Sequence, residues 1–341
     1  MQNKHRLAYF VHLWHLIKAC VARRKRVAML AKVWINYGVA SITHRSWLNT
    51  LPYAIAIEPT ALCNLACPEC PTGRKEGKRT RGAMGLSLFK KVIDEVQPHA
   101  FYLTLYFQGE PLLNPDFCEM VRYAKQHQFY VCTSTNAHLL TSEMAENIVA
   151  SGIDKVIVSL DGATQESYAT YRKNGNLQQV LKGIQNLVEA KNKQVTYTPY
   201  IEVQTIVFSF NEHELSALKR LSNTLGADAF VIKTAQLYNY QSGHSLMPKS
   251  SRYSRYVAQA DGTYRLKKRQ RNRCLRCMNT AVVTWDGLLL PCCFDKDTRY
   301  AYGSIAHQSF AAVYTNAQAR TFRRQVFQHR NAIEICTNCS E

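Results

Sequence analysis

The sequence predicts an α/β fold whose parallel sheet forms an open or closed barrel. From residue 52 to about residue 240, six strand-like runs alternate with helical segments. A helix between successive strands returns the chain to the same end of the sheet, so the six strands should be parallel. No glycine-rich phosphate loop follows the first strand, which favours a barrel over a doubly wound nucleotide-binding sheet.

Hydrophobic periodicity places the individual elements. Residues 101–107 read Phe-Tyr-Leu-Thr-Leu-Tyr-Phe, the near-continuous hydrophobicity of a strand buried on both faces. Asn114, Thr141 and Asn211 are candidate residues for helix starts. We expect strands at 53–57, 100–107, 129–133, 155–160, 200–207 and 229–232, and helices near 86–96, 115–127, 141–151, 177–192 and 211–225.

Residues 5–37 predict one or two basic amphipathic helices. The basic run at 23–26 interrupts their apolar stripe. We expect residues 1–50 to form a helical arm that either packs on the main domain with a solvated basic face or contacts an anionic membrane surface or an acidic partner. The apolar positions recur at steps of three and four residues, at Leu7, Phe10, Val11, Trp14, Ile17 and Val21.

The excess positive charge is concentrated in two segments. The chain has 341 residues and a formal net charge of +19. Nine Lys and Arg residues lie in residues 1–50 and seven in residues 265–276, neither of which contains an acid, so the rest of the chain is nearly neutral. The charge is therefore not strong support for nucleic-acid binding. The composition is that of a globular protein, which excludes disordered and collagen-like classes.

The cysteines are expected to bind metal rather than to form disulfides. The longest apolar stretch, residues 7–22, is interrupted by His12, His15 and Lys18, and a spanning helix needs about 20 mostly apolar residues. We therefore expect a cytoplasmic protein, with peripheral membrane contact as an option. Cytosolic thiols stay reduced, so closely spaced cysteines are metal ligands before disulfides.

Three cysteines directly follow the first expected strand. Cys63, Cys67 and Cys70 have the spacing C-x3-C-x2-C. Zinc sites usually take four ligands in two pairs, and a complete iron–sulfur site takes four thiolates. Three thiolates without a nearby fourth favour a [4Fe–4S] cluster that leaves one iron open to a substrate or cofactor. A structural zinc site with a remote fourth ligand is the alternative.

This loop resembles the hallmark of the radical S-adenosylmethionine (radical SAM) superfamily, in which it follows strand one of a partial (β/α)6 barrel. The resemblance implies that Cys63, Cys67 and Cys70 hold the cluster and that S-adenosylmethionine chelates its unique iron through the amino and carboxylate groups. It also implies reductive cleavage to a 5′-deoxyadenosyl radical, which abstracts hydrogen from a substrate. A flavodoxin or ferredoxin is the kind of electron donor implied.

Motifs at the ends of the next strands extend the resemblance. Gln108-Gly-Glu-Pro111 resembles the Gly-Gly-Glu-Pro motif that contacts the methionine amino group. Glu69 stands where an aromatic residue beside adenine is usual, and Gln108 replaces the first glycine, which implies a turn with less conformational freedom. The cofactor-binding residues implied by the resemblance are Gly109, Glu110, Pro111, Thr135, Asn136, Ser159, Asp161 and Arg172.

A second group of cysteines lies in the C-terminal part of the chain. It resembles the SPASM extension of radical SAM enzymes, including a hairpin turn at residues 284–287. A complete SPASM domain carries seven cysteines and two auxiliary clusters, and the final cysteine is absent here. We therefore expect one auxiliary [4Fe–4S] cluster, with four ligands from Cys274, Cys277, Cys292, Cys336 and Cys339.

Which of these five is not a ligand stays open. A zinc ribbon built from Cys274, Cys277, Cys336 and Cys339 is the alternative. The remaining cysteines are expected to be buried core thiols, namely Cys20, Cys118, Cys132 and Cys293.

The prediction is therefore a three-part enzyme. Residues 1–50 form the basic helical arm, residues 51–240 a radical SAM partial barrel, and residues 241–341 a small SPASM-like iron–sulfur domain. We expect modification of a peptide, a protein or a metabolite. Two other hypotheses are a radical enzyme that acts on RNA and a non-enzymatic zinc-binding interaction protein.

No catalytic acid or base stands out in the sequence. Glu202 and Gln204 on the fifth strand and Lys233 on the sixth should face the barrel and could touch substrate. Packing in the core or a plain salt bridge is an equal alternative for each of the three.

Overall fold

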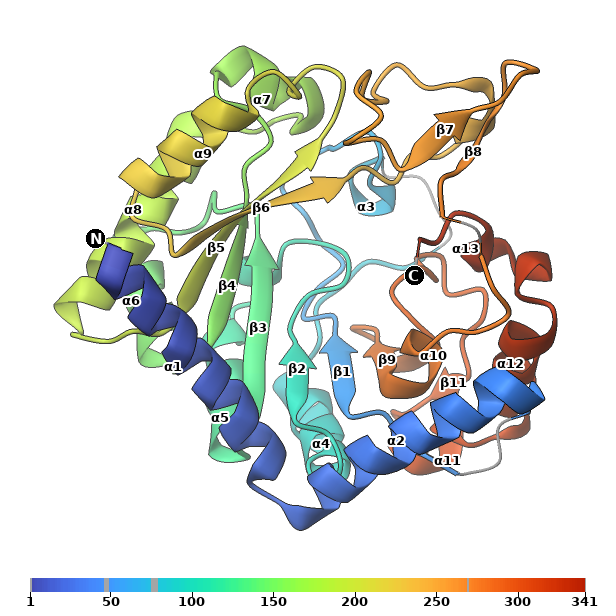
Figure 1. The fold of residues 1–341 in the computed structure, drawn as a ribbon. Helices are drawn as coiled ribbons and strands as arrows, with labels where there is room; N and C mark the ends of the chain where they lie inside the picture. The colour runs from blue at the N-terminus through green and yellow to red at the C-terminus, as the bar shows by residue number, and fades with distance from the viewer. Residues whose placement is uncertain (1, 46–48, 75–78, 269, 341) are drawn as a thin grey trace.

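The computed structural model describes residues 2–45, 49–74, 79–268 and 270–340 and contains a nine-stranded, mostly parallel sheet (Figure 1). The strand order is β11-β10-β9-β1-β2-β3-β4-β5-β6, which is linear, so the barrel is open. The six predicted strands are confirmed, and they pair parallel in chain order. They are β1 (Ala54–Ile57), β2 (Tyr102–Thr104), β3 (Tyr130–Thr135), β4 (Lys155–Ser159), β5 (Tyr200–Val207) and β6 (Ala229–Thr234).

Helices cover the outer face of this sheet (Figure 1). Alternate strand residues such as Leu103, Val131 and Val156 belong to the same buried core as the apolar faces of these helices. They are α4 (Leu86–Val96), α5 (Phe117–Gln126), α6 (Ser142–Ala150), α8 (Leu177–Lys193) and α9 (Leu215–Thr224), while the short α7 (Gln165–Tyr171) was not predicted.

One of the three predicted helix starts is confirmed. The Thr141 side chain accepts a hydrogen bond from Met144 N (3.1 Å) and caps α6. Asn114 accepts instead from Asp116 N, one residue before α5 begins. The prediction for Asn211 is wrong, because α9 begins only at Leu215; the Asn211 amide donates to the carbonyls of Asp161 and Ile206, which ties two strand ends together.

The C-terminal segment continues the barrel sheet. β9 (Thr280–Val283) pairs parallel with β1, and β10 (Leu288–Leu290) and β11 (Gly303–Ser304) extend the sheet antiparallel. The predicted hairpin turn joins β9 to β10, with Gly287 at φ +86°. The division of the chain after residues 50 and 240 stays a prediction. The other elements are α3 (Pro71–Arg74), β7 (Tyr256–Ala258), β8 (Tyr264–Leu266), α10 (Arg276–Asn279), α11 (Phe310–Tyr314), α12 (Ala317–Gln328) and α13 (Glu334–Thr337), with short 3-10 helices at Pro111–Leu113, Tyr240–Ser242 and Arg330–Ala332.

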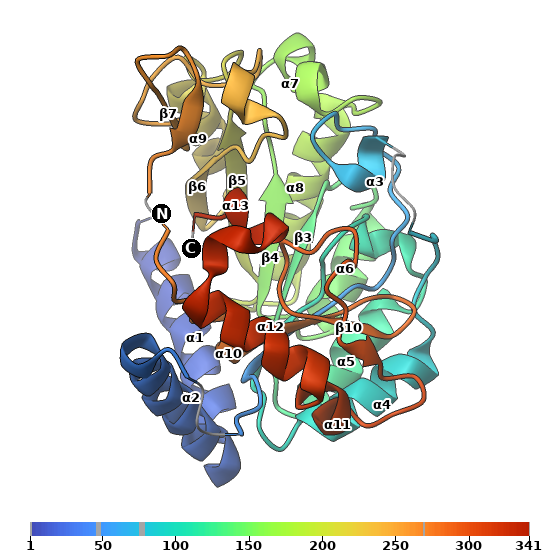
Figure 2. The same ribbon diagram turned by 90° about the vertical axis from the view of Figure 1, so that its right-hand side faces the viewer.

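Two N-terminal helices lie on one side of the molecule in both ribbon views (Figures 1 and 2). α1 (Gln2–Val21) contacts β2, β3 and β5, and its Ala19 packs with Tyr130 and Ile157 on the inner face of the sheet. α2 (Arg24–Thr43) follows after a short break. No helix among the described residues has the length and apolar character needed to cross a membrane.

The basic run at 23–26 is not wholly solvated. Arg24 and Lys25 are exposed, but Arg26 is completely buried and donates hydrogen bonds to four backbone carbonyls. The expectation of a solvated basic face therefore fails at Arg26. Hydrophobic periodicity could not reveal this, because the acceptors come from distant parts of the chain.

Candidate active site

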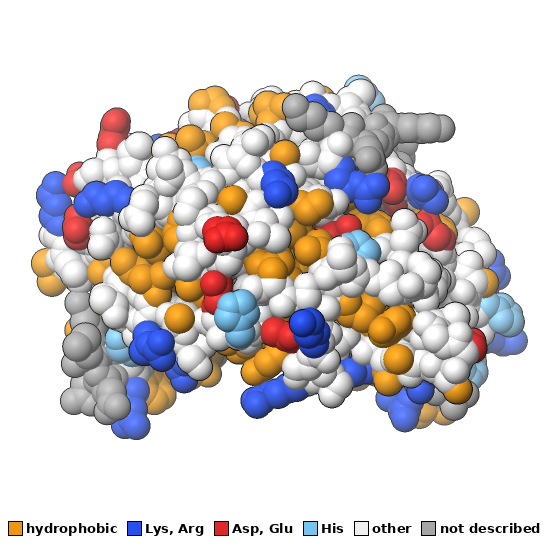
Figure 3. Space-filling view, turned by 90° about the horizontal axis from the view of Figure 1, so that it is seen from above, with side chains coloured by type: hydrophobic (Ala, Val, Ile, Leu, Met, Phe, Trp, Pro, Cys, Tyr) orange, Lys and Arg blue, Asp and Glu red, His pale blue; other side chains and the backbone are white. Residues whose placement is uncertain are grey.

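A pocket of about 610 Å³ opens at the carboxyl ends of the barrel strands, where barrel enzymes place their active sites. Figure 3 looks onto this end of the molecule and shows basic, acidic and hydrophobic side chains interspersed over it. Nine of the predicted site residues line the pocket: Cys63, Cys67, Cys70, Gly109, Glu110, Thr135, Asn136, Ser159 and Arg172.

The loop that carries the first three cysteines is held in place by its neighbours. Ala66 N donates to the Lys173 carbonyl (3.1 Å), and the Cys70 amide donates to the Cys67 carbonyl (3.2 Å). A side chain at Gly73 would approach Cys67 N to 2.5 Å, so α3 packs against the loop only because residue 73 is glycine. All three thiols therefore face one pocket from a braced loop.

The turn after β2 requires its one remaining glycine. Gly109 has φ +75°, and a Cβ there would lie 2.3 Å from the Thr60 carbonyl oxygen. Gln108 has no such positive φ, so its replacement of a glycine causes no backbone strain. Its side chain instead accepts from the Thr72 hydroxyl (3.3 Å) and lies 3.9 Å from the Cys70 sulfur.

Glu110 joins three strand ends inside the pocket. Its carboxylate accepts hydrogen bonds from the Thr135 hydroxyl (2.7 Å), Asn136 N (2.7 Å) and Leu112 N (3.2 Å). Burial raises the pKa of Glu110, while these hydrogen bonds oppose the shift. The Asn136 amide also donates to Asn64 in the cysteine loop (2.8 Å).

Arg172 reaches the pocket as half of a buried ion pair. Its guanidinium lies 2.6 Å from Asp161, whose other oxygen accepts from Ile206 N (2.7 Å). It also lies 3.9 Å from the Cys67 sulfur. Burial opposes the charge, but Asp161 and Cys67 raise the pKa of Arg172 above its ordinary value. Asp161 and Pro111, also predicted site residues, are buried behind the pocket wall.

Three further cations line the pocket, and only Lys233 among them was predicted to face the barrel. They are Lys233 from β6, Arg255 from the segment before β7, and Lys296 from the segment after Cys292 and Cys293. The Arg255 Nε and Nη1 atoms are buried with no hydrogen-bond partner among the described residues. Arg255 and Lys296 reach the pocket only through tertiary packing, so no local spacing could have found these two.

Of the three side chains expected to touch substrate, Gln204 and Lys233 line the pocket. Glu202 does not. It is buried and accepts a hydrogen bond from Lys155 (2.7 Å), so the salt-bridge alternative holds for it.

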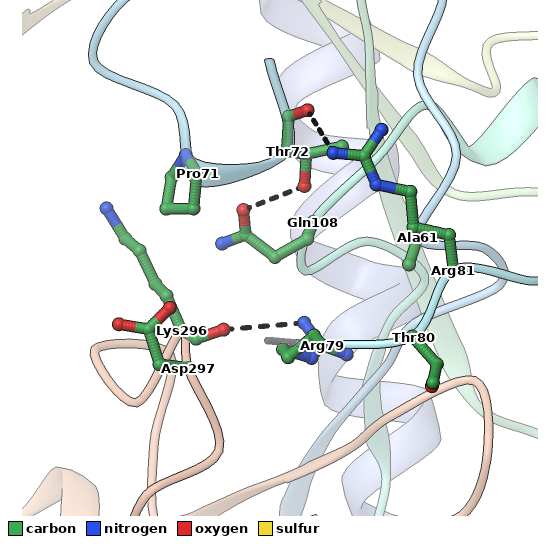
Figure 4. Close-up of a pocket in the computed structure, with 9 residues that line it drawn as sticks. All are labelled: Ala61, Pro71, Thr72, Arg79, Thr80, Arg81, Gln108, Lys296 and Asp297. Carbon is green, nitrogen blue, oxygen red and sulfur yellow. Dashed lines mark hydrogen bonds between the residues drawn. The ribbon is translucent and has the colours of Figure 1, made fainter. Parts of the chain in front are cut away.

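A smaller pocket lies beside the main one (Figure 4). The two share Pro71, Gln108 and Lys296. Arg79 donates to the Lys296 carbonyl (3.5 Å) and forms an ion pair with the buried Glu58 after β1. The segment that follows Cys292 and Cys293 is thereby held against the barrel.

Glu69, which stands where an aromatic residue is usual, also has a structural role. Its carboxylate accepts from Tyr238 N (2.7 Å) and lies 3.4 Å from the His244 ring. The cysteine loop is therefore tied to the segment that follows β6.

Three of the five predicted auxiliary ligands, Cys274, Cys336 and Cys339, lie close to Arg330. The Arg330 guanidinium lies 3.4 Å from the Cys339 sulfur, and the Cys277 thiol donates to the Cys274 carbonyl (3.1 Å). Interaction with Cys277 lowers the pKa of Cys274 to about 6. Burial raises the pKa of Cys292, and the nearby thiols Cys293, Cys274 and Cys336 add to this.

The cysteines expected to be core thiols are not all buried. Cys132 is fully buried, whereas Cys20, Cys118 and Cys293 are half-buried. Cys293 lies 3.6 Å from an Arg276 nitrogen. Cys293, next to the predicted ligand Cys292, therefore has a polar neighbour and does not lie in the hydrophobic core.

The donor chemistry of both groups fits iron–sulfur clusters. No three His, Cys, Asp or Glu side chains among the described residues converge as a single metal ion requires, whereas a cluster binds each thiolate at a separate iron. Burial raises the pKa of Cys63 to about 11 and also raises that of Cys67, so a metal is needed to hold them as thiolates.

An open α/β barrel with three loop thiols at its mouth and a second cysteine group beside it defines a class of iron–sulfur radical enzymes. Comparison with family models agrees: residues 57–220 match the radical SAM superfamily, and residues 274–340 match SPASM, an iron–sulfur cluster-binding domain. The chain belongs to the radical SAM superfamily and carries a C-terminal SPASM domain. It is an enzyme with an S-adenosylmethionine-binding [4Fe–4S] cluster and auxiliary iron–sulfur binding. This finding argues against the hypothesis of a non-enzymatic zinc-binding protein.

Similar curated proteins have several different activities. A tungsten-containing aldehyde ferredoxin oxidoreductase cofactor-modifying protein of Pyrococcus furiosus is 28% identical over 83% of this chain and 86% of its own length. The mycofactocin maturase MftC of Mycobacterium tuberculosis is 32% identical over 52% of this chain and 43% of its own. A PqqA peptide cyclase of Bradyrhizobium diazoefficiens is 26% identical over 65% of this chain and 56% of its own. The chain thus spans about half the length of the last two.

Solved structures share the fold at lower identity. Streptococcus suis SuiB bound to S-adenosylmethionine superposes with a TM-score of 0.64 at 12% identity, over 89% of this chain and 75% of SuiB. BtrN in complex with AdoMet and 2-DOIA gives 0.53 at 20% identity, over 86% and 95%. These similarities support the partial barrel.

Proposed function

We propose that this enzyme abstracts hydrogen from a peptide that carries a carboxylate group. The observation that carries the proposal is the composition of one pocket, whose lining combines three thiols and six of the predicted cofactor-binding residues with the cations Lys233, Arg255 and Lys296. Two similar proteins support the peptide as substrate. One is the PqqA peptide cyclase, and the other is SuiB, which has been crystallised with its precursor peptide SuiA.

The proposed roles of the cofactor-binding residues follow from the radical SAM resemblance and from the charges of their side chains. When bound, the cluster and S-adenosylmethionine supply the electron and the 5′-deoxyadenosyl radical. Glu110 is placed to accept from the cofactor amino group, with Thr135 and Asn136 holding its carboxylate in position. Arg172 is placed to bind the cofactor carboxylate, and Asp161 orients it.

Three cations in the pocket lining are suited to bind an anionic group of the substrate, namely Lys233, Arg255 and Lys296. Burial lowers the pKa of Lys296, because the charged amine is removed from water. An anionic group on the substrate would offset that desolvation. A peptide carboxylate is such a group, either at its C-terminus or on an acidic side chain.

Modification of a cofactor or metabolite is the second candidate. It is favoured by the Pyrococcus furiosus cofactor-modifying protein, which aligns with this chain over 86% of its own length. An RNA substrate has less support, because charges of both signs are interspersed at the barrel mouth (Figure 3).

The first experiment tests the radical chemistry. Anaerobically reconstituted wild-type protein with dithionite should form 5′-deoxyadenosine from S-adenosylmethionine, and the triple variant Cys63→Ala, Cys67→Ala, Cys70→Ala should form none. The matched control is Cys118→Ala, a half-buried cysteine outside both groups, which should retain wild-type turnover. Turnover by the triple variant would contradict the assignment.

The second experiment tests the substrate class. A pool of short peptides with free C-termini and acidic side chains should increase 5′-deoxyadenosine formation several-fold, whereas the same peptides amidated at every carboxylate should not. Lys296→Met should remove this stimulation and leave the basal cleavage unchanged. Equal stimulation by both pools would reject carboxylate recognition, and stimulation only by carboxylate-bearing metabolites would favour the second candidate.

A further inference from the structure

The outward faces of α1 and α2 are unusually apolar. Fifteen large hydrophobic side chains are exposed among the described residues, and eleven of them lie on these two helices. Phe10 is 64% exposed, Trp14 62% and Ile42 80%. We call this surface the arm face: Leu7, Tyr9, Phe10, Trp14, Ile17, Val21, Val27, Trp34, Ile35, Val39 and Ile42.

The two helices differ from an ordinary surface helix, because they carry large hydrophobic side chains on the solvent side as well as on the side that packs in the core. The sides that face the protein also carry polar groups: His15 Nδ1 donates to the Asp154 carboxylate (2.7 Å), His12 stacks on Tyr200, and Arg26 is buried. Packing onto the barrel uses these polar groups together with apolar residues such as Leu16, Leu30 and Val33. It does not account for the apolar side, which is left facing solvent.

Positive charge accompanies the arm face. The exposed basic side chains on these helices are Arg6, Lys18, Arg24, Lys25 and Lys32. Residues 1–57 contain no Asp or Glu. At 3.6 residues per turn, Arg6 and Lys18 lie on either side of the stripe formed by Phe10, Trp14 and Ile17.

We propose that the arm face docks on an anionic lipid bilayer, with α1 and α2 lying in the plane of the interface. Apolar and aromatic side chains flanked by Lys and Arg are the composition that inserts at the boundary between headgroups and acyl chains, and Trp14, Trp34 and Tyr9 suit that boundary. Both helices lie on the same side of the molecule, so one bilayer surface can contact both (Figures 1 and 2).

Charge decides between a bilayer and a second copy of the chain. Two arm faces in contact would bring their basic residues together with no acid on either helix to pair with them. An anionic bilayer offers negative charge and an apolar interior at once. The proposal is independent of the substrate proposed above.

The test is flotation of the full-length, cluster-containing protein with vesicles. The wild type should bind vesicles of phosphatidylglycerol and phosphatidylcholine and bind pure phosphatidylcholine at least tenfold more weakly. Phe10→Gln with Trp14→Gln and Ile17→Gln should weaken binding at least tenfold. Lys18→Gln with Arg24→Gln and Lys32→Gln should weaken it by roughly fivefold per charge removed. The matched control is Val195→Gln with Tyr197→Gln, two exposed hydrophobic residues elsewhere, which should bind as the wild type.

A second measurement uses only the intact wild type, so it does not depend on the folding of the variants. Brominated phosphatidylglycerol should quench tryptophan fluorescence, because Trp14 and Trp34 enter the interface. Absence of vesicle binding and of quenching would overturn the proposal. So would a dimer, measured by light scattering, that the apolar triple variant converts to monomer, because the arm face would then be an interface between copies.

Discussion

At the scale of single residues, the site depends on positions where only one side chain fits. Gly109 is the clearest: its backbone has φ +75°, and the carbonyls of Thr60 and Leu62 lie 2.3 and 2.6 Å from where a Cβ would be. This close approach lets Glu110 N donate to the Leu62 carbonyl (2.7 Å) and so attaches the strand-two turn to the cysteine loop. That attachment fixes the position of the Glu110 carboxylate in the pocket.

Gly109→Ala should therefore lower stability by about 3 kcal/mol or more, since a left-handed residue costs about 1–2 kcal/mol and overpacking adds about 1–3. It should also lower 5′-deoxyadenosine formation at least tenfold. Gly262→Ala is the matched control, because Gly262 has φ +79° but nothing within 4 Å of the new Cβ. Its expected cost in urea unfolding is about 1 kcal/mol. Equal losses for both variants would contradict the steric explanation.

At the scale of elements, one side chain fastens the N-terminal helices to the barrel. The buried Arg26 donates to the carbonyls of Ala19 (2.8 Å), Gln97 (3.1 Å), Gln128 (2.8 Å) and His127 (2.9 Å). Gln97 and His127 are the C-terminal caps of α4 and α5, where the helix dipole favours a cation. The arm is thus held by a guanidinium that satisfies the ends of two barrel helices.

Arg26→Ala should destabilise the protein by about 3 kcal/mol, because four backbone carbonyls, one buried and three partly buried, lose a charged donor. Arg26→Lys should recover only part of this, since an ammonium group cannot reach all four acceptors with the guanidinium geometry. Lys25→Ala, at an exposed neighbouring position, should change stability by less than about 0.5 kcal/mol. Urea unfolding of the three variants measures these differences, and full recovery by lysine would refute the capping role.

At the scale of the whole molecule, the barrel and the C-terminal segment form one body. β9 pairs with β1 over four residues, and the buried Glu58 accepts from both Arg79 and Trp285 N. His99, in the turn before β2, is buried, and its ring lies 6.0 Å from that of Phe310 in α11. A neutral histidine therefore lies where the two parts meet.

This histidine predicts a pH dependence of stability. Burial and the nearby Arg26 lower the pKa of His99 from 6.5 to about 4. The unfolded chain then binds the proton more strongly, so stability is full above about pH 6.5 and falls as the pH drops toward 4. Between pH 7 and pH 5 the contribution of His99 to stability should fall by about 2 kcal/mol, measured in urea unfolding as the difference between the wild type and a variant without this histidine.

The variant His99→Phe isolates this contribution. It should remove the loss between pH 7 and pH 5, whereas the exposed control His307→Gln should retain it. An unchanged pH slope in His99→Phe would show that another group is responsible.

Much of the fold was predictable because its signals are local. The six strands and five of the covering helices follow from hydrophobic runs that each element carries within itself. The position of β9 in the same sheet beside β1 was not predictable in this way, because residues 280–283 and 54–57 lie far apart in the chain. Pairing between segments that lie far apart in the chain leaves no periodic trace in either one.

The sequence by itself determined the parallel order of β1 to β6 and the three thiols after β1. It also placed Gly109, Glu110, Thr135, Asn136 and Ser159 at the strand ends and Arg172 in the segment after β4, and all six share one pocket with those thiols. Local spacing carries that information, because in a parallel sheet every strand ends at the same edge. The tertiary structure alone decided that Arg255 and Lys296 line the same pocket as the cysteines, that Arg26 is buried, and that α1 and α2 expose large apolar side chains to solvent. Each of these depends on contacts between distant segments, which no window along the chain contains.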